Sequence, residues 1–254
     1  MLTDTHIHLY NKEFDPDREQ CIEQAVLAGV GRFFLPNIDL ESIAPMLALE
    51  AAHPDRCFAM MGLHPCYVKE DWQEQLAVIE LWWERRTFCA VGEIGIDLYW
   101  DKSTLALQEE AFSRQIQLAN RYNKPVVIHC RESFNEIMAV LKKFPKQTPQ
   151  GIFHCFSGNA DQAREVIQLG FSLGIGGVVT YKKSGLDHVV KEIPLEHIVL
   201  ETDAPYLAPV PFRGKRNTPE YVRIVAEQIA NIKGIKLEEV AAVTTENSRK
   251  IFGC

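Results

Sequence analysis

Two histidines near the start of the chain, His6 and His8, have the type and spacing of metal ligands. Side chains two residues apart on a β-strand point to the same face, so a strand over residues 2–8 would direct both imidazoles at one point in space. A pair of exposed polar residues is the alternative interpretation, because two ligands alone do not make a metal site. The choice depends on whether the rest of the chain supplies more ligands.

Further potential ligands lie at or near the ends of other apolar runs. Three more histidines and two carboxylates have this placement, namely His64, Glu93, His129, His154 and Asp203. A single histidine at a strand end is usually a structural residue that forms hydrogen bonds. Five histidines and two carboxylates at such positions instead indicate a site.

The apolar runs predict eight β-strands. They are short, bounded by turn residues, and cover residues 2–8, 31–38, 57–64, 88–95, 125–131, 151–157, 171–177 and 197–203. Helical signals separate them, among them a stretch that closes at Gly29, an amphipathic segment over 103–122 and a proline-initiated segment from Thr218 to about Lys233. This alternation predicts an α/β protein with the closed (β/α)8 TIM barrel fold.

The length of 254 residues suits one such barrel, and no linker-like stretch divides the chain. We therefore expect a single (β/α)8 domain over residues 1–254. Active sites of this fold lie at the C-terminal ends of the strands, which is where the candidate ligands are placed. The fold and the ligand positions thus predict one common site.

Composition narrows the class of protein. No apolar run approaches the ~20 residues that span a bilayer, and the first strand begins at once without a secretory signal. Seven cysteines without a C-x-x-C pair indicate reduced thiols, so we expect a cytoplasmic protein with no membrane association. The net charge of −7 argues against a broad basic surface for nucleic acid.

Several local motifs resemble those of the TatD family of metal-dependent hydrolases and deoxyribonucleases. They are His6-Ile7-His8, Gly62-Leu63-His64-Pro65, Val91 to Asp97, Val127 to Arg131, His154 to Gly158, Glu201 to Tyr206 and Arg213 to Asn217. The resemblance implies a barrel of the amidohydrolase type, a one- or two-metal site and DNA phosphodiesters as substrate, digested 3′ to 5′. It also extends to enzymes proposed to remove mischarged amino acids from tRNA.

Roles can be assigned to the ligand candidates from their chemistry. Histidine and carboxylate ligands without thiolate suit Zn²⁺, Mn²⁺, Fe²⁺ or Co²⁺, and Mg²⁺ prefers more oxygen ligands. The sequence alone does not choose the metal, and we expect Mg²⁺, Mn²⁺ or Zn²⁺. We predict two divalent ions, one held by His6, His8 and Asp203 and a second by His129 and His154, with Glu93 bridging them. Asp203 is the predicted general base, and Glu201, one alternation earlier on the same face, would support it.

Other residues are candidates for contact with substrate. His64 would donate a hydrogen bond to a phosphate or leaving oxygen, or else hold its strand end against the loop. Arg131 would bind a nonbridging phosphate oxygen, or else pair with Glu132 or another loop acid. The cluster after the last strand would grip phosphate, or else form a solvated surface, and it comprises Arg213, Lys215 and Arg216.

Three classes of function fit these residues. The favoured one is a metal-dependent deoxyribonuclease that acts on single-stranded or frayed 3′ ends of DNA, with no obligate protein partner. The second is hydrolysis of a carbon-centred ester or amide, such as D-aminoacyl-tRNA deacylation. Two-metal amidohydrolases commonly use a carboxylated lysine where this chain has Glu93, which favours the first class. The third is a non-catalytic metal-binding scaffold, which the presence of Asp203 and every ligand disfavours.

Overall fold

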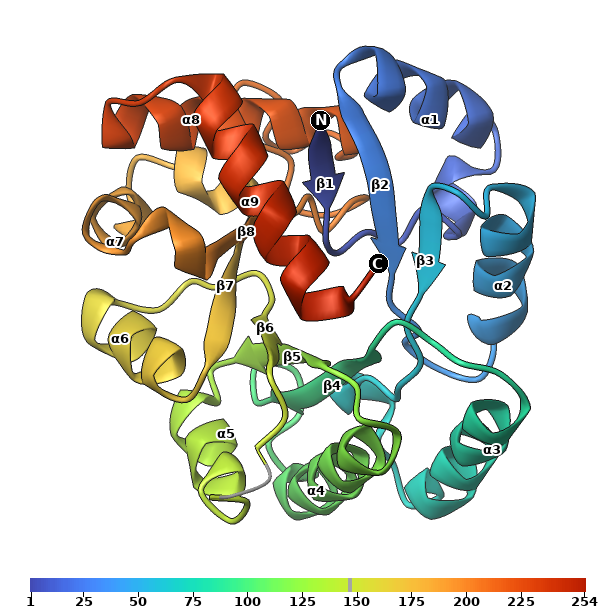
Figure 1. The fold of residues 1–254 in the computed structure, drawn as a ribbon. Helices are drawn as coiled ribbons and strands as arrows, with labels where there is room; N and C mark the ends of the chain where they lie inside the picture. The colour runs from blue at the N-terminus through green and yellow to red at the C-terminus, as the bar shows by residue number, and fades with distance from the viewer. Residues whose placement is uncertain (146–147) are drawn as a thin grey trace.

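The computed structural model describes residues 1–145 and 148–254, in which parallel strands and helices alternate around a ring (Figure 1). The strands are β1 (Leu2–Asp4), β2 (Val30–Leu35), β3 (Cys57–Ala59), β4 (Val91–Asp97), β5 (Val126–Arg131), β6 (Gly151–Phe153), β7 (Phe171–Ile175) and β8 (Ile198–Leu200). The helices are α1 (Arg18–Leu27), α2 (Ile43–Ala52), α3 (Trp72–Arg85), α4 (Leu105–Tyr122), α5 (Phe134–Leu141), α6 (Ala160–Gln168), α7 (Leu186–Glu192), α8 (Val222–Lys233) and α9 (Leu237–Phe252).

The strands pair in two parallel sets, β1 to β3 and β4 to β8, in chain order. Backbone hydrogen bonds join the sets at both seams. Thr5 N–H donates to the Leu200 carbonyl at 2.9 Å, and Met61 N–H donates to the Ala90 carbonyl at 3.1 Å. The ring is therefore closed, and the predicted (β/α)8 fold is confirmed.

Several strands end earlier than the sequence pattern predicts. The strand expected through His8 stops at Asp4, and the runs expected to end at His64, Ser157 and Asp203 stop at Ala59, Phe153 and Leu200. The extra residues form irregular segments that remain buried and bonded, as where His8 N–H donates to the Ala204 carbonyl at 2.9 Å. The candidate ligands thus lie mainly on extensions beyond the strands, where strict two-residue alternation no longer applies.

The barrel interior is filled by apolar side chains at the end that α9 covers. One buried cluster draws a residue from or beside most strands and consists of Phe34, Met60, Ala90, Val127, Ile152, Val199 and Phe252. The ring of Phe252, at the end of α9, stacks on Phe34 with centroids 4.0 Å apart. Figure 1 shows α9 lying across this end of the ring of strands. Because α9 closes this end, the opposite end is the open one.

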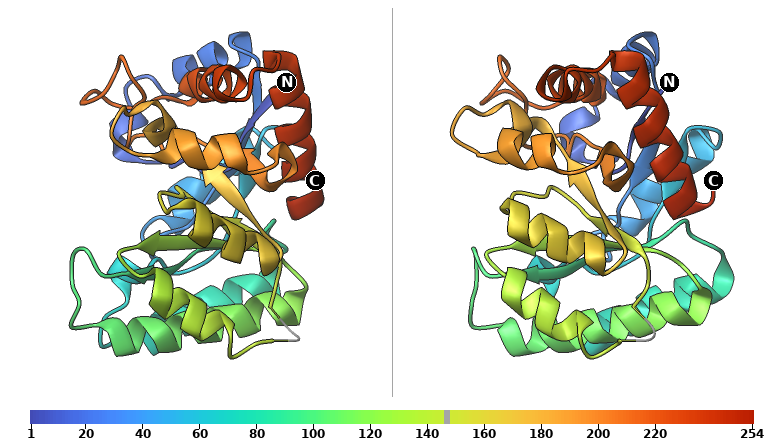
Figure 2. Two further views of the ribbon diagram at one scale, coloured as in Figure 1. Left: turned by 90° about the vertical axis from the view of Figure 1, so that its left-hand side faces the viewer. Right: turned by 60° about the vertical axis from the view of Figure 1, so that its left-hand side comes forward.

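The loops at the open end are the ones that carry chemistry. Figure 2 shows the β4–α4 loop and the long segment between β8 and α8 projecting from the side opposite α9.

Among the described residues, no helix combines the length and the apolar composition that a membrane span needs.

We predict that Gly151→Ala will destabilise the fold, because an added Cβ would overlap the carbonyl oxygen of Val126 on the paired strand β5. The cost should be at least about 2 kcal/mol, measured by urea unfolding, since a backbone atom cannot move aside as a side chain can. Gly31→Ala is the control, since its Cβ would meet only the flexible side chain of Met1 at 2.6 Å. Equal losses in both variants would contradict the close approach of β5 and β6.

Candidate metal centre

The carboxylate of Glu93, on β4, is the centre of the candidate site. It is 2% exposed, and imidazole nitrogens from other strand ends surround it. Its Oε1 lies 2.8 Å from His154 Nε2, 2.9 Å from His129 Nδ1 and 3.3 Å from His64 Nε2. Its Oε2 lies 3.1 Å from His6 Nε2 and 3.8 Å from His8 Nε2.

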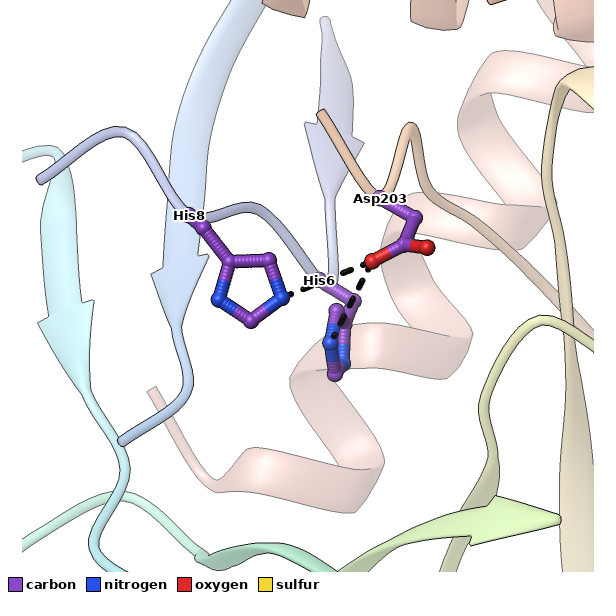
Figure 3. Close-up of side chains that lie close together, drawn as sticks. All are labelled: His6, His8 and Asp203. Atoms are coloured by element: carbon purple, nitrogen blue, oxygen red, sulfur yellow. Dashed lines mark ion pairs between the residues drawn. The ribbon is translucent and has the colours of Figure 1, made fainter. Parts of the chain in front are cut away.

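Asp203 completes the cluster from the segment after β8. Its Oδ1 lies 3.4 Å from His8 Nε2 and 3.8 Å from His6 Nε2, so the three side chains converge as shown in Figure 3. Asp203 has a φ of 56°, in the left-handed region that non-glycine residues seldom adopt. Its N–H donates to the His6 carbonyl at 2.9 Å, which ties the two ligand segments together.

Hydrogen bonds behind the ring of histidines fix which nitrogen faces the centre. The Tyr10 hydroxyl donates its single proton to the Pro36 carbonyl at 2.5 Å, so His8 Nδ1–H must donate to the Tyr10 oxygen at 2.9 Å. His129 lies between two carboxylates, with Nε2 2.8 Å from Asp97 Oδ2 and Nδ1 2.9 Å from Glu93 Oε1, and the tautomer that suits a metal ligand donates Nε2–H to Asp97. With these protons in place, the uncharged forms of both rings present lone pairs to the carboxylates at the centre. Burial opposes protonation of His129, but its hydrogen bonds to Asp97 and Glu93 raise its pKa.

The His64 ring is oriented the other way, with its N–H facing the centre. Its Nδ1 accepts from the backbone N–H of Cys66 at 3.1 Å, so the proton of the neutral ring lies on Nε2. The imidazole therefore offers an N–H, not a lone pair, toward Glu93 and the cavity. This arrangement suits a hydrogen-bond donor to substrate better than a metal ligand, although the ring also caps its loop.

The donor set fits a divalent cation. Lone pairs of imidazole and carboxylate that face one another at about 3 Å repel unless a proton or a metal ion lies between them. Burial and the charge of His154 lower the pKa of His6, and burial lowers that of His64, which favours neutral rings. Burial acts to raise the pKa of Glu93, but His154, His64 and His6 hold it well below its usual range, as an ionised ligand requires.

Glu201 lies behind His154 instead of behind Asp203. Its Oε1 accepts from the Cys155 N–H at 2.6 Å and lies 3.5 Å from His154 Nδ1. Burial opposes protonation of His154, but Glu93 and Glu201 together raise its pKa well above the usual value. A side chain at Gly174 would overlap the Glu201 carboxylate, so this position requires glycine. Glu201 is thus placed to orient a ligand of the predicted second metal.

A cavity of about 900 Å³ lies above the cluster. Three of the four positively charged side chains that were predicted to bind substrate line this cavity. They are Arg131, Arg213 and Lys215. Arg131 rests on the ring of Tyr99, 3.9 Å from its centroid, instead of pairing with Glu132. Arg213 rests on the ring of Tyr181 at 4.6 Å.

Arg216 is not brought to the cavity. Its guanidinium forms a bidentate ion pair with Asp17 at 2.6 and 2.9 Å and lies over the ring of Phe14. The predicted phosphate contact at this position therefore does not match the structure. The sequence signal failed because a neighbouring charge on another element, at the start of α1, competes for the side chain.

Sequence reasoning missed two residues that orient ligands. Asp97 ends β4 four residues after Glu93, and its hydrogen bond to His129 helps to lower its pKa to about 2 against the effect of burial. Tyr10 follows His8 by two residues, a spacing that could have indicated it. Cys155 directly follows His154, and strand alternation would place the two side chains on opposite faces; its φ of 46° breaks that alternation, and it lines the cavity.

Comparison with known proteins agrees with this geometry. The model of the family described as TatD related DNase matches residues 3–253. The chain belongs to the TatD family. It is 41% identical over 253 residues to the uncharacterized metal-dependent hydrolase YabD of Bacillus subtilis, covering 99% of both chains.

Other relatives of this TatD-family hydrolase include one with a named activity. The 3′-5′ ssDNA/RNA exonuclease TatD of Pantoea ananatis is 34% identical, with 98% of each chain covered. The crystal structure of the TatD homologue YjjV from Escherichia coli matches with a TM-score of 0.93 and 32% identity, over 100% of this chain and 98% of that one. The chain is therefore a metal-dependent hydrolase.

We predict that Glu93→Gln will reduce binding of both metal ions, whereas His154→Ala will mainly reduce binding of one. The reason is that Glu93 contacts both ligand sets, and His154 contacts one carboxylate oxygen of Glu93. Metal analysis after dialysis against a defined amount of Mn²⁺ or Zn²⁺ measures the stoichiometry. Loss of a single ion in both variants would contradict a bridging role for Glu93.

Proposed function

We propose that this chain hydrolyses phosphodiester bonds of DNA, starting at the 3′ ends of single strands or frayed duplexes. The observation that carries the proposal is the arrangement of Glu93 and Asp203 below a cavity whose walls bear Arg131, Arg213 and Lys215. Carboxylates and histidines that fit two cations, with positive side chains above them, suit an anionic phosphate ester. The named activity of the Pantoea relative supports the choice of nucleic acid and the polarity.

The residues that would hold two metal ions are His6, His8 and Asp203 for one, His129 and His154 for the other, and Glu93 for both. When bound, such ions stabilise negative charge on the phosphate and make water more acidic. The metal ion that serves in the cell is among Mg²⁺, Mn²⁺ and Zn²⁺.

The side chains of the protein accept the proton, bind the phosphate and donate a hydrogen bond to it. Asp203 is the general base, because burial raises its pKa but His8, His154 and His6 outweigh that effect and keep the carboxylate ionised. Arg131, Arg213 and Lys215 bind nonbridging oxygens of the phosphate and orient the strand. His64 donates the hydrogen on Nε2 to the phosphate or to the leaving oxygen.

One assay compares this function with cleavage of a carbon-centred ester. The metal-loaded chain is incubated with end-labelled single-stranded DNA, the matching duplex, and D-aminoacyl-tRNA. A ladder shortened from the 3′ end of the single strand is expected, with little attack on the tRNA ester. Release of the amino acid without DNA cleavage would contradict the proposal.

Asp203→Asn should lower the turnover of single-stranded DNA by at least ~10² while the fold is retained, because it removes the proton acceptor and weakens one of the two predicted metal sites. Circular dichroism checks the fold, and removal of metal from the unmodified chain by chelator should abolish activity reversibly. Asp101→Asn, in an exposed loop acid that pairs with Lys69 at 3.7 Å, is the matched control. Near-normal turnover of the Asp203 variant would show that another residue accepts the proton.

Binding of single-stranded DNA should depend weakly on salt. Three cavity cations, each contributing about −0.7, give a slope of log K against log salt near −2. Arg213→Ala should flatten the slope by about one contact, and Arg216→Ala should leave it unchanged because that guanidinium is paired with Asp17. A slope steeper than about −6 would indicate an extended basic surface, contrary to the net charge of −7.

A further inference from the structure

The β4–α4 loop presents two large aromatic side chains to solvent at the rim of the cavity. Trp100 is 70% exposed and Tyr99 is 50% exposed, and Trp100 lines the same cavity as Glu93 and His129. Exposed aromatic groups of this size add little to folding, and a group of them beside a polar site marks a surface for a ligand. The loop lies on the open side of the barrel (Figure 2).

A single carboxylate fixes this loop relative to the metal centre. Asp97 Oδ1 accepts the backbone N–H groups of Tyr99 at 2.9 Å and Trp100 at 3.2 Å. The other oxygen, Oδ2, accepts from His129 Nε2 at 2.8 Å. The aromatic pair is therefore held at a defined position beside a predicted ligand instead of on an independent loop.

Arg131 completes the surface. Its guanidinium lies 3.9 Å from the centroid of the Tyr99 ring and 5.5 Å from that of Trp100, so it covers Tyr99. The Tyr99 and Trp100 rings meet edge to face, with centroids 4.9 Å apart and an interplanar angle of 89°. This packing leaves the large, exposed indole as the free aromatic surface, with a cation beside it.

We propose that Trp100, supported by Tyr99 and Arg131, is a stacking site for an unpaired nucleobase next to the phosphate held at the metal centre. This inference rests on the proposed function and adds the part of the substrate that is recognised. Every base has a π-face that can stack on an indole, whereas a base inside a duplex has both faces covered by its neighbours. Trp100 therefore selects single strands without selecting a sequence.

The positively charged side chains elsewhere on the cavity wall are suited to the backbone of the strand and not to its bases. Arg213, over Tyr181, and Lys215 offer positive charge to the sugar-phosphate backbone. Loss of Trp100 should thus reduce affinity for bases, while loss of Arg213 should reduce affinity for phosphate. The two effects can be separated by removing either the bases or the charges.

The test measures binding of a labelled single-stranded oligonucleotide to the metal-loaded Asp203→Asn variant, whose cleavage is expected to be slower by at least ~10². Affinity is compared with that for an oligonucleotide whose three terminal nucleotides at each end lack bases. Trp100→Ala is expected to weaken binding of the complete strand about 10-fold or more and to leave binding of the base-free strand unchanged. Trp100→Phe should retain most of the affinity.

Trp82→Ala is the matched control. Trp82 lies on the outer helix α3, away from the cavity, and carries Arg85 at 5.5 Å, the same separation that joins Arg131 to Trp100. The Trp82→Ala variant should bind both strands as tightly as the parent chain, and urea unfolding of each variant checks that the fold is intact.

Three results would overturn the inference. If Trp100→Ala changes binding of neither strand, or weakens both equally, the stacking site is wrong, and cleavage of DNA by the unmodified chain would leave the proposed function in place. If the unmodified, metal-loaded chain cleaves neither strand, the proposed function fails and the stacking site fails with it.

Discussion

The convergence of five imidazoles on the buried carboxylate of Glu93 is the constraint on which the rest of the structure depends. An ionised carboxylate inside a protein is costly unless opposite charge and hydrogen-bond donors surround it. Here the surrounding nitrogens come from β5 and from the segments after β1, β3 and β6, so the cluster forms only when the ring of strands is closed. The seams at Thr5 and Met61 thus hold the site together as well as the sheet.

The hydrogen bonds behind the cluster determine what the histidines can do. Tyr10 and Asp97 each accept a hydrogen bond from the outer N–H of one ring, which leaves that ring's lone pair facing the centre, whereas the Cys66 N–H donates to His64 and leaves its N–H facing the centre. Residues of one type, all near Glu93, therefore divide into ligand candidates and a hydrogen-bond donor. Asp97 has a second task, because its other oxygen holds the loop that carries Tyr99 and Trp100.

The sequence predicted the parts of this arrangement that follow from order along the chain. Alternating strand and helix signals predicted the closed barrel, and the position of histidines near strand ends predicted which side chains come together. It could not predict contacts between distant elements. Arg216 binds Asp17 from the start of α1, and Cys155 turns into the cavity because the chain leaves β6 at Phe153. The two-residue alternation used for His6 and His8 led to the correct neighbourhood, although the strand itself ends at Asp4.

The most direct test of the account is electron paramagnetic resonance of the chain loaded with two equivalents of Mn²⁺. If Glu93 bridges two ions, the spectrum should be that of an exchange-coupled pair, and Glu93→Gln should abolish the coupling. A spectrum of isolated Mn²⁺ ions at two equivalents, unchanged by Glu93→Gln, would contradict a metal centre built around this carboxylate.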